Sequence, residues 1–239
     1  ADKLNQLAEH AYSNREDFRS VLPWLLSSEA INAWTFGRSL GLIDSKTDLW
    51  PLLLEAQEKY GPKVTPLLLG GYLFSISNIS VKCYSKLFEQ IRNNHNLRKF
   101  VPELTRLSGL SDSSVSRIFD MVKTGELTKA DLLSIIWSNE IKNLSEPVIM
   151  QIISILLESD SENAGRGALD VLESYYVRQK VILPSELTLK TLTHPSFFDK
   201  VRKSLRNPTE GWHWGKVAHS LIDNHPICML PLAKVIVEH

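Results

Sequence analysis

The side chains best suited to hold a metal ion or to anchor a partner gather near the C-terminus. They are His213, His219, His225, His239, Trp212 and Trp214. Imidazoles that share a metal ion from one helix stand three or four residues apart, because only that spacing places them on one face. The first three histidines stand six apart, which puts His213 and His219 on opposite faces. We therefore expect no metal site, and we take Trp212 and Trp214, beside glycines and a polar stretch, as candidate anchors for a protein partner.

Motifs that bind phosphates or carry a nucleophile are missing from the sequence. There is no Gly-x-x-x-x-Gly-Lys-Ser/Thr loop, no Gly-x-Ser-x-Gly elbow and no His-Glu-x-x-His pair. Gly70-Gly71 and Gly165-Arg166-Gly167 are too short to cradle a phosphate. We therefore expect a non-catalytic chain without catalytic residues, metal or cofactor. The members of a catalytic triad can lie far apart in a sequence, so this expectation rests on local motifs alone.

One short stretch resembles the opening motif of the ribonuclease III family. It is Thr191-Leu192-Thr193-His194-Pro195-Ser196-Phe197. That family also carries an acidic helix similar to Glu-Arg-Leu-Glu-Phe-Leu-Gly-Asp, which holds magnesium. Here Phe198, Asp199, Lys200 and Val201 follow, and no such helix appears. We attribute the match to chance and predict no nuclease activity from it.

Residues 104–118 resemble the helix-turn-helix of bacterial repressors. Their sequence, Leu-Thr-Arg-Leu-Ser-Gly-Leu-Ser-Asp-Ser-Ser-Val-Ser-Arg-Ile, puts Gly109 where the turn needs a residue tolerant of positive φ, and Ser111 at the start of the second helix. In such motifs the second helix enters the major groove of DNA. A nucleic-acid-binding interpretation of residues 82–123 assigns candidate contacts to Lys99, Arg106, Ser113, Ser114 and Arg117.

Several features count against DNA recognition by this stretch. Asp112 and Asp120 would repel phosphates, and the second helix sets Arg117 against them. Thr105 stands where the resemblance implies a small residue, and neither a β-wing nor dimerising heptads follow. Between Lys82 and Arg106, however, six side chains are basic and two are acidic. We therefore keep DNA or RNA binding as the alternative function.

Helical spacing of apolar residues recurs along the chain and must position all of these groups. The stripes are Phe18/Val21/Leu22/Leu25, Val115/Ile118/Phe119/Val122, Ile149/Ile152/Ile153/Leu156/Leu157 and Leu169/Leu172/Tyr176. Capping signals are Ser13 with Glu16, Ser111, Thr128 with Asp131, and Ser145 ahead of Pro147. Alternation favours a strand only within Gly70–Val81, and Pro66 predicts a helix start there instead.

The spacing of apolar anchors indicates a helical repeat. Leu87, Ile118 and Ile152 are separated by 31 and 34 residues, and Leu22–Leu26 resembles Leu49–Leu53. Two helices of ~12 residues with their turns give a period of roughly 30 to 40. The spacing resembles HEAT or armadillo repeats at the level of the superfamily. The resemblance implies an all-α fold of stacked antiparallel helix pairs, similar to an α-solenoid, with an irregular helical bundle as the alternative.

Composition limits the class of protein. The 239 residues include 27 basic and 27 acidic side chains, and this zero net charge disfavours a protein held mainly by polyanions. No apolar run reaches the roughly 20 residues that cross a bilayer, so we expect no membrane partner. Cys83 and Cys228 cannot form a disulfide framework, and we expect buried, unreactive thiols. The predicted compartment is the cytoplasm.

Two polar stretches, Ser159–Gly167 and Asp199–Gly211, mark candidate seams. We predict a helical-repeat region at 1–160 and a continuation of the array at 161–239, or a single domain over 1–239. The chain starts at Ala1 and stops inside an apolar stretch, so we expect a segment of a larger protein. The leading hypothesis is a non-catalytic interaction or scaffold segment that binds a protein partner or neighbouring domains of its own chain.

Overall fold

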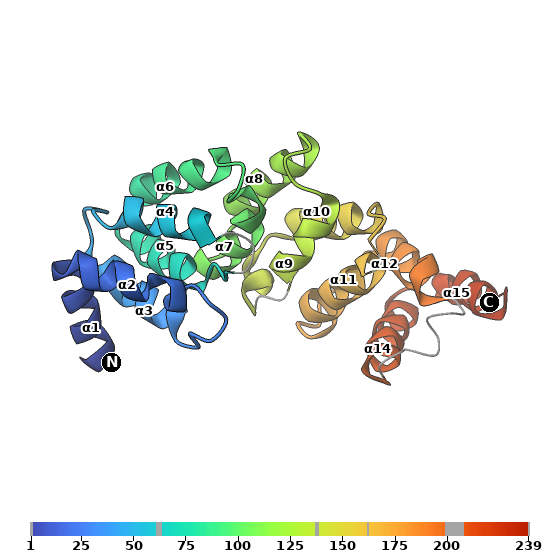
Figure 1. Cartoon of the computed structure of the whole chain (residues 1–239). Coiled ribbons are helices and arrows are strands. Elements are labelled where there is room, and N and C mark those ends of the chain that lie inside the picture. Colours follow the sequence, from blue (N-terminus) through green and yellow to red (C-terminus); the bar gives the residue numbers. More distant parts are fainter. Residues whose placement is uncertain (1, 61–63, 137–138, 162, 199–207, 239) are drawn as a thin grey trace. The chain divides into compact units, whose positions relative to one another are not determined.

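The computed structural model describes residues 2–60, 64–136, 139–161, 163–198 and 208–238. Within these ranges the regular elements are all helical and no strand occurs, so the predicted all-α class is confirmed (Figure 1). The segment that alternation favoured as a strand is helix α5 (Leu67–Ile79), which begins directly after Pro66 as the proline signal predicted. No helix in the described ranges is both long and apolar enough to span a bilayer.

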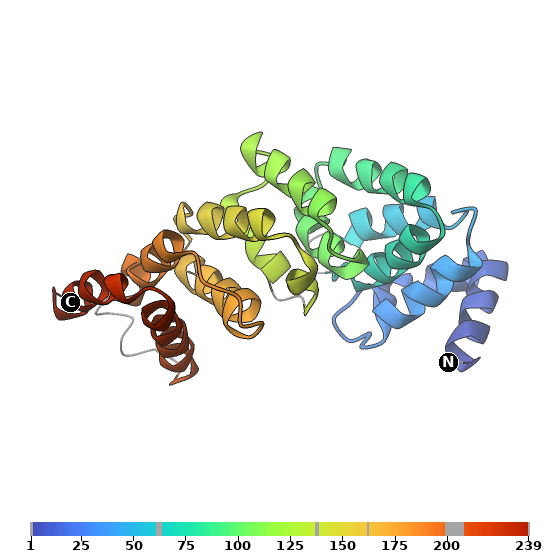
Figure 2. The same cartoon turned by 180° about the vertical axis from the view of Figure 1, so that it is seen from behind.

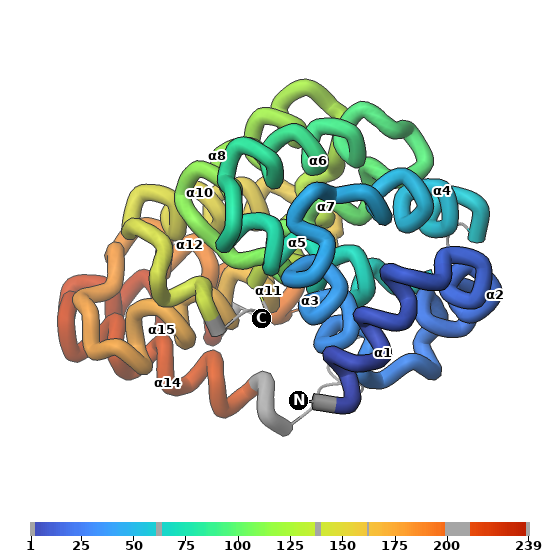
Figure 3. The backbone as a smooth tube through the Cα atoms, turned by 90° about the vertical axis from the view of Figure 1, so that its left-hand side faces the viewer, coloured from blue at the N-terminus to red at the C-terminus, as the bar shows by residue number. Residues whose placement is uncertain are grey.

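The chain divides into two compact units, and the first is Ala1–Leu110. Its helices are α1 (Asp2–Ser13), α2 (Arg15–Leu25), α3 (Ala33–Ile43), α4 (Trp50–Tyr60), α5 (Leu67–Ile79), α6 (Val81–Asn93), the 3-10 turn η2 (Arg98–Phe100) and α7 (Val101–Ser108). Helix α5 packs against α3 and against α7 (Figures 1 and 3). Six successive residues of α5, 68–73, are buried, so this part of the helix is covered around its whole circumference and lies inside the core.

Helices α3 and α5 approach each other backbone to backbone through glycines. A Cβ atom on Gly41 would lie 2.6 Å from the carbonyl oxygen of Tyr72. A Cβ atom on Gly37 or Gly71 would collide with a carbonyl oxygen of the facing helix. Gly37 and Gly41 are four residues apart, so they share the face of α3 that meets α5. We refer to Gly37, Gly41 and Gly71 as the glycine seam.

A buried aspartate fixes the turn between α3 and α4. The Asp44 carboxylate accepts hydrogen bonds from the backbone N–H of Asp48 at 2.7 Å and of Leu49 at 2.8 Å. The hydroxyl of Tyr72 donates a third bond at 2.7 Å. Burial, and then the bond to this carboxylate, raise the pKa of Tyr72 well above its usual value. The three hydrogen bonds therefore compensate the loss of hydration of the Asp44 carboxylate, which water does not reach.

The second unit is Ser111–His239. Its elements are α8 (Asp112–Lys123), η3 (Lys129–Leu132), α9 (Leu133–Ile136), η4 (Asn139–Asn143), α10 (Glu146–Leu157), α11 (Ala164–Val171), the π-helical turn η5 (Leu172–Val177), α12 (Ser185–Leu192), η6 (Pro195–Phe197), α14 (Pro208–Asn224), η7 (Pro226–Cys228) and α15 (Met229–Glu238). Helix α11 packs against α10, α12 and α14, and Figure 2 shows these helices from behind in yellow to red.

Most of the predicted helix starts are observed, and one is wrong. Ser111 accepts a hydrogen bond from the backbone N–H of Ser114 and caps α8, and the box of Thr128 with Asp131 opens η3. The prediction that Ser13 caps a helix is wrong, because α1 continues through Ser13 and α2 begins at Arg15.

The stripe at Leu169, Leu172 and Tyr176 also needs a correction. We predicted one α-helix from its spacing, but α11 ends at Val171 and Leu172–Val177 forms a π-helical turn. All three side chains are nevertheless buried. The π-helical turn thus keeps these side chains in the core.

The anchors of the expected repeat are buried on successive elements. Leu87 lies on α6, Ile118 on α8 and Ile152 on α10, and each is within a core. The polar stretch Ser159–Gly167 falls inside the second unit, and its last four residues, 164–167, already belong to α11, whereas much of Asp199–Gly211 lies outside the described residues. The stacking of helix pairs into an α-solenoid, and the predicted division at residue 160, stay predictions.

Candidate functional site

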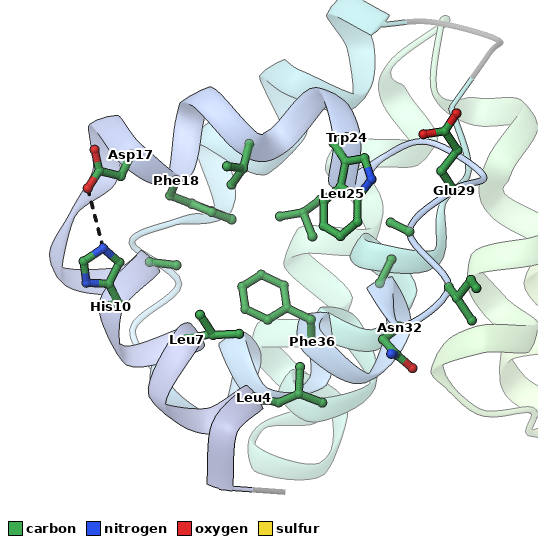
Figure 4. Close-up of a pocket in the computed structure, with 15 residues that line it drawn as sticks. Leu4, Leu7, His10, Asp17, Phe18, Trp24, Leu25, Glu29, Asn32 and Phe36 are labelled. Atoms are coloured by element: carbon green, nitrogen blue, oxygen red, sulfur yellow. Dashed lines mark ion pairs between the residues drawn. The ribbon is translucent and has the colours of Figure 1, made fainter.

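An open apolar groove runs along α2 in the first unit (Figure 4). Helix α1, helix α2, the segment that joins α2 to α3, and the start of α3 line a volume of about 610 Å³. Phe18, Leu25 and Phe36 are buried and form its floor. The rings of Phe18 and Phe36 meet edge to face, with centroids 6.3 Å apart. We call this hollow the α2 groove.

Large apolar side chains stand exposed around that floor. Trp24 is 55% exposed and Ile31 is 88% exposed, and Leu7 and Val21 are also open to solvent. Val21 belongs to the stripe from which we predicted one buried face for this helix. In the structure Phe18, Leu22 and Leu25 face the core, while Val21 and Trp24 lie on the adjoining stripe that borders the groove. Apolar side chains from two helices and a connecting segment thus converge on one hollow, and no element of the described ranges covers it.

The ionisable side chains that line the groove are two acids and a histidine. Asp17 and Glu29 lie toward different ends of the groove, and Nε2 of His10 lies 3.5 Å from Oδ2 of Asp17 (Figure 4). The cations of α2, Arg15 and Arg19, line a separate hollow beside α4. The rim of the α2 groove is therefore acidic, and it favours a cationic ligand over an anionic one.

The apolar lining of the groove suits an amphipathic α-helix. A helix with its side chains is ~10–12 Å across, and helix-in-groove recognition uses apolar anchors at positions i, i+3 or i+4, and i+7. Tryptophan is enriched among the residues that contribute most to binding energy, so Trp24 is the strongest single anchor in this lining. The groove holds no serine, cysteine or lysine that could act as a nucleophile.

No family model, curated protein or solved structure matches this chain. The resemblances to HEAT or armadillo repeats and to a repressor helix-turn-helix therefore stay predictions.

The two tryptophans that the sequence singled out occupy different environments on α14. The ring of Trp214 is half-buried. Its indole N–H donates to the carbonyl oxygen of Leu192 at 3.1 Å, and this bond joins α14 to α12. Trp212 is 58% exposed, and the Lys216 ammonium lies 3.6 Å from the centroid of its ring. Trp214 thus packs within the unit, and Trp212 alone of the pair presents a ring to solvent.

The histidines near the C-terminus do not converge. His219 is exposed, Nε2 of His225 lies 2.9 Å from the carbonyl oxygen of Leu183, and His239 lies outside the described residues. His213 faces Glu173 instead, with its Nδ1 3.9 Å from Oε2. In the described ranges no three His, Cys, Asp or Glu side chains gather in a way that could hold a metal ion.

Among the acids of the second unit whose burial the structure describes, Glu173 is the most strongly buried, and it lies on the π-helical turn. It is 1% exposed, and Nε of Arg178 donates to Oε2 at 2.7 Å. Nζ of Lys216 lies 3.6 Å from Oε1. Arg178, directly after the turn, and Lys216 on α14 therefore neutralise one carboxylate, which ties α14 to the turn. We assign this cluster a structural role.

The candidate nucleic-acid contacts are divided between the two units. Lys99 and Arg106 belong to the first unit, and Ser113, Ser114 and Arg117 belong to the second. Arg106 lies 3.5 Å from Glu103, and Lys99 is exposed beside the ring of Phe100. Ser114 is buried and bonds Ser111, whereas Ser113 is exposed and Arg117 is half-buried on α8.

The rest of the helix-turn-helix-like stretch has local structural roles. Gly109 adopts the positive φ that we expected, at 107°. Oδ1 of Asp112 accepts a hydrogen bond from the backbone N–H of Ser145 at 2.9 Å, so this acid holds the start of α10.

The stretch that resembled a ribonuclease III motif forms a tight turn. His194 precedes η6, and its Nδ1 accepts a hydrogen bond from the backbone N–H of Ser196 at 3.3 Å. Burial, and then the charge of Lys190, lower the pKa of His194. A Cβ atom on Gly165 would lie 2.7 Å from the same Nδ1, so α11 packs closely on this turn. We therefore assign this turn a structural role, as a surface on which α11 packs.

Sequence reasoning missed the residues that form the α2 groove. Trp24 entered only through the similarity of Leu22–Leu26 to Leu49–Leu53, and neither Leu7 nor Ile31 was predicted to be an exposed anchor. One signal was present: Leu4, Leu7, Ala8 and Ala11 have the spacing of an apolar helix face. That spacing predicts α1, but it does not tell which part of the face another helix covers.

Proposed function

We propose that this chain is a helical interaction module that docks one amphipathic helix of a protein partner in the α2 groove. The observation that carries the proposal is the convergence of four exposed apolar side chains, Leu7, Val21, Trp24 and Ile31, over an aromatic floor. Burying apolar surface yields about 25 cal/mol per Å². Clustered apolar surface of this kind marks interaction sites on soluble proteins.

The acidic rim adds a preference for one kind of helix. Asp17 and Glu29 favour a partner whose apolar stripe is bordered by lysine or arginine, and they disfavour an acidic helix. Charges at the rim contribute more to discrimination and to the association rate than to affinity. The apolar floor therefore supplies the binding energy, and the rim selects the partner.

The basic residues that supported nucleic-acid binding are partly engaged within the unit. Arg92 lies 3.9 Å from Glu89, and Arg106 lies 3.5 Å from Glu103. Nε of Arg98 donates to the carbonyl oxygen of Arg92 at 2.9 Å. Paired cations attract phosphates less strongly than solvated ones, which is why we rank a protein partner ahead of DNA or RNA.

The cytoplasm remains the compartment that we propose. Cys83 is half-buried and Cys228 is buried, and both are free thiols. Free thiols are usual where glutathione keeps cysteines reduced.

A displayed library of amphipathic helical peptides, selected on the whole chain, tests the proposal. We expect enriched peptides to share an i, i+3/i+4, i+7 apolar stripe with flanking basic residues. Their affinity is then measured by fluorescence anisotropy. Trp24→Ala should weaken binding about 30-fold, because truncating a central aromatic anchor costs about 2 kcal/mol.

Trp212→Ala is the matched control. It removes the same side chain at a similar exposure, 58% against 55% for Trp24, from a helix outside the groove. We expect it to leave affinity unchanged. Loss of binding in Trp212→Ala with retention in Trp24→Ala would move the interface to α14 and refute the proposal, and so would a library that yields no helix at all.

A further inference from the structure

Helix α15 carries a second apolar surface without a cover in the described part of the chain. It contacts its own unit through Leu232, which is buried, and through the preceding Cys228. On the adjoining side Met229, Leu230, Ala233, Ile236 and Val237 are exposed. At 100° per residue these five positions fill one continuous arc of about 120°. We call them the α15 arc.

A helix that is apolar around most of its circumference is stable when other elements surround it. Leu230 is 78% exposed and Val237 is 84% exposed, so water covers the α15 arc in the single copy. The same chain offers the α2 groove, which lacks a helix. We infer that the α15 arc of one copy docks in the α2 groove of a second copy, head to tail. This inference rests on the proposed function of the groove.

The two surfaces agree in length and in pattern. Helix α15 has 10 residues and α2 has 11, which correspond to about 15 Å and about 16 Å of helix. Within the arc, Met229, Ala233 and Ile236 follow the i, i+4, i+7 spacing that fills a groove, and Leu230, Ala233 and Val237 follow i, i+3, i+7. Each helical turn of α15 thus offers an apolar side chain to the groove.

The charges agree as well. From Met229 to Val237 the one charged residue is Lys234, which borders the arc, and no acid occurs in that range. The groove is lined by Asp17 and Glu29, and its cationic neighbours Arg15 and Arg19 line a different hollow. Docking therefore brings the Lys234 cation to an acidic rim, while Glu238, the last residue of α15, is not part of the arc.

Association of this kind leaves binding surfaces free. The contact joins two different patches, so each bound pair still carries one open groove and one open arc. Further copies can add until a ring closes or the concentration limits growth. The contact involves one short helix and falls among interfaces of less than about 1,200 Å², which bind weakly.

Analytical ultracentrifugation of the whole chain tests the inference. Between about 5 and about 500 µM, which brackets the dissociation constant of a small interface, we expect the average mass to rise above 27.1 kDa. Trp24→Glu damages the groove and Leu230→Glu damages the arc. Each variant alone should stay at the monomer mass, while Trp212→Glu, outside both surfaces, should associate like the wild type.

Mixing the two damaged variants supplies the decisive measurement. Trp24→Glu keeps an intact arc and Leu230→Glu keeps an intact groove, so an equimolar mixture should form 1:1 dimers and nothing larger. A misfolded variant cannot produce this recovery, and circular dichroism checks that each variant keeps its helices.

Three results would overturn the inference. The first is a wild-type chain that stays at the monomer mass throughout the range. The second is loss of association in Leu230→Glu but not in Trp24→Glu, which would indicate contact between two α15 helices. The third is a mixture that forms no dimer. If selected peptides bind the groove while the wild type stays monomeric, the proposed function stands and only the head-to-tail contact is wrong.

Discussion

Gly71→Ala is the sharpest test of how the first unit is held together. A Cβ atom at this position would lie 2.8 Å from the carbonyl carbon of Trp34 and 2.9 Å from the backbone nitrogen of Arg38, besides colliding with the Trp34 carbonyl oxygen. These are backbone atoms of α3, so no side-chain rotation relieves the contact. Ordinary contacts begin near 3.4 Å, so α3 and α5 would have to separate by about 1 Å.

Two opposing effects determine how much Gly71→Ala changes the free energy of unfolding. Overpacking a core costs about 1–3 kcal/mol, and a clash with main-chain atoms belongs at the upper end. Replacing glycine by alanine within a helix gains about 1 kcal/mol. We therefore expect Gly71→Ala to lower the free energy of unfolding by about 2 kcal/mol, which corresponds to a melting temperature about 10 °C lower for a unit of this size.

Urea and thermal denaturation followed by circular dichroism measure the change. Hydrogen exchange read by mass spectrometry assigns it to peptides from α3 and α5. Gly215→Ala on α14 is the control, since nothing lies within 4 Å of a Cβ atom there, and it should be neutral or stabilising by up to about 1 kcal/mol. A Gly71→Ala chain as stable as the wild type would refute the backbone-to-backbone packing.

Three further predictions follow from groups described above. The Asp44 carboxylate accepts three hydrogen bonds, and in Asp44→Asn a single acceptor oxygen remains for the three donors. Urea denaturation should therefore show a free energy of unfolding lower by about 3 kcal/mol. A decrease of less than about 1 kcal/mol would contradict the network. The pKa of His194 lies below its ordinary 6.5, so the unfolded chain binds this proton more readily than the folded chain, and the free energy of unfolding falls as the pH drops below 6.5. In His194→Asn the dependence of the free energy of unfolding on pH should be weaker between about pH 5 and 7. An unchanged dependence would contradict this prediction. In gel shifts with random duplex DNA we expect no strong binding, whereas a salt-sensitive shift lost in Lys99→Ala with Arg117→Ala would favour the nucleic-acid alternative.

Features that depend on neighbouring residues were predictable from the sequence. Ser111 caps its helix, and Gly109 adopts a positive φ of 107°, because caps and turns are decided within a few residues. Ser13 failed as a cap because the preceding helix extended over it. The π-helical turn at Leu172–Val177 was not predicted because its apolar residues keep the spacing of an α-helix.

Features that depend on which helices meet were not predictable in this way. Trp24 and Trp50 occupy similar local patterns, yet Trp50 is 3% exposed and Trp24 is 55% exposed. The ring of Trp50 stacks on Tyr72 at 5.9 Å, and its N–H donates to Gln90 at 2.6 Å, from helices distant in the sequence. No comparable helix covers Trp24 in the described part of the chain, and this difference creates the groove.

The glycine seam also has a thermodynamic consequence for whatever enters the α2 groove. Helix α3 supplies Phe36 to the groove floor while its glycine face is locked against α5. The receptor surface is thus preorganised, and the entropic cost of complex formation falls mainly on the incoming ligand. Calorimetry should then record a negative heat-capacity change set by the apolar area removed from water. Loosening the seam should reduce affinity although no mutated atom touches the ligand.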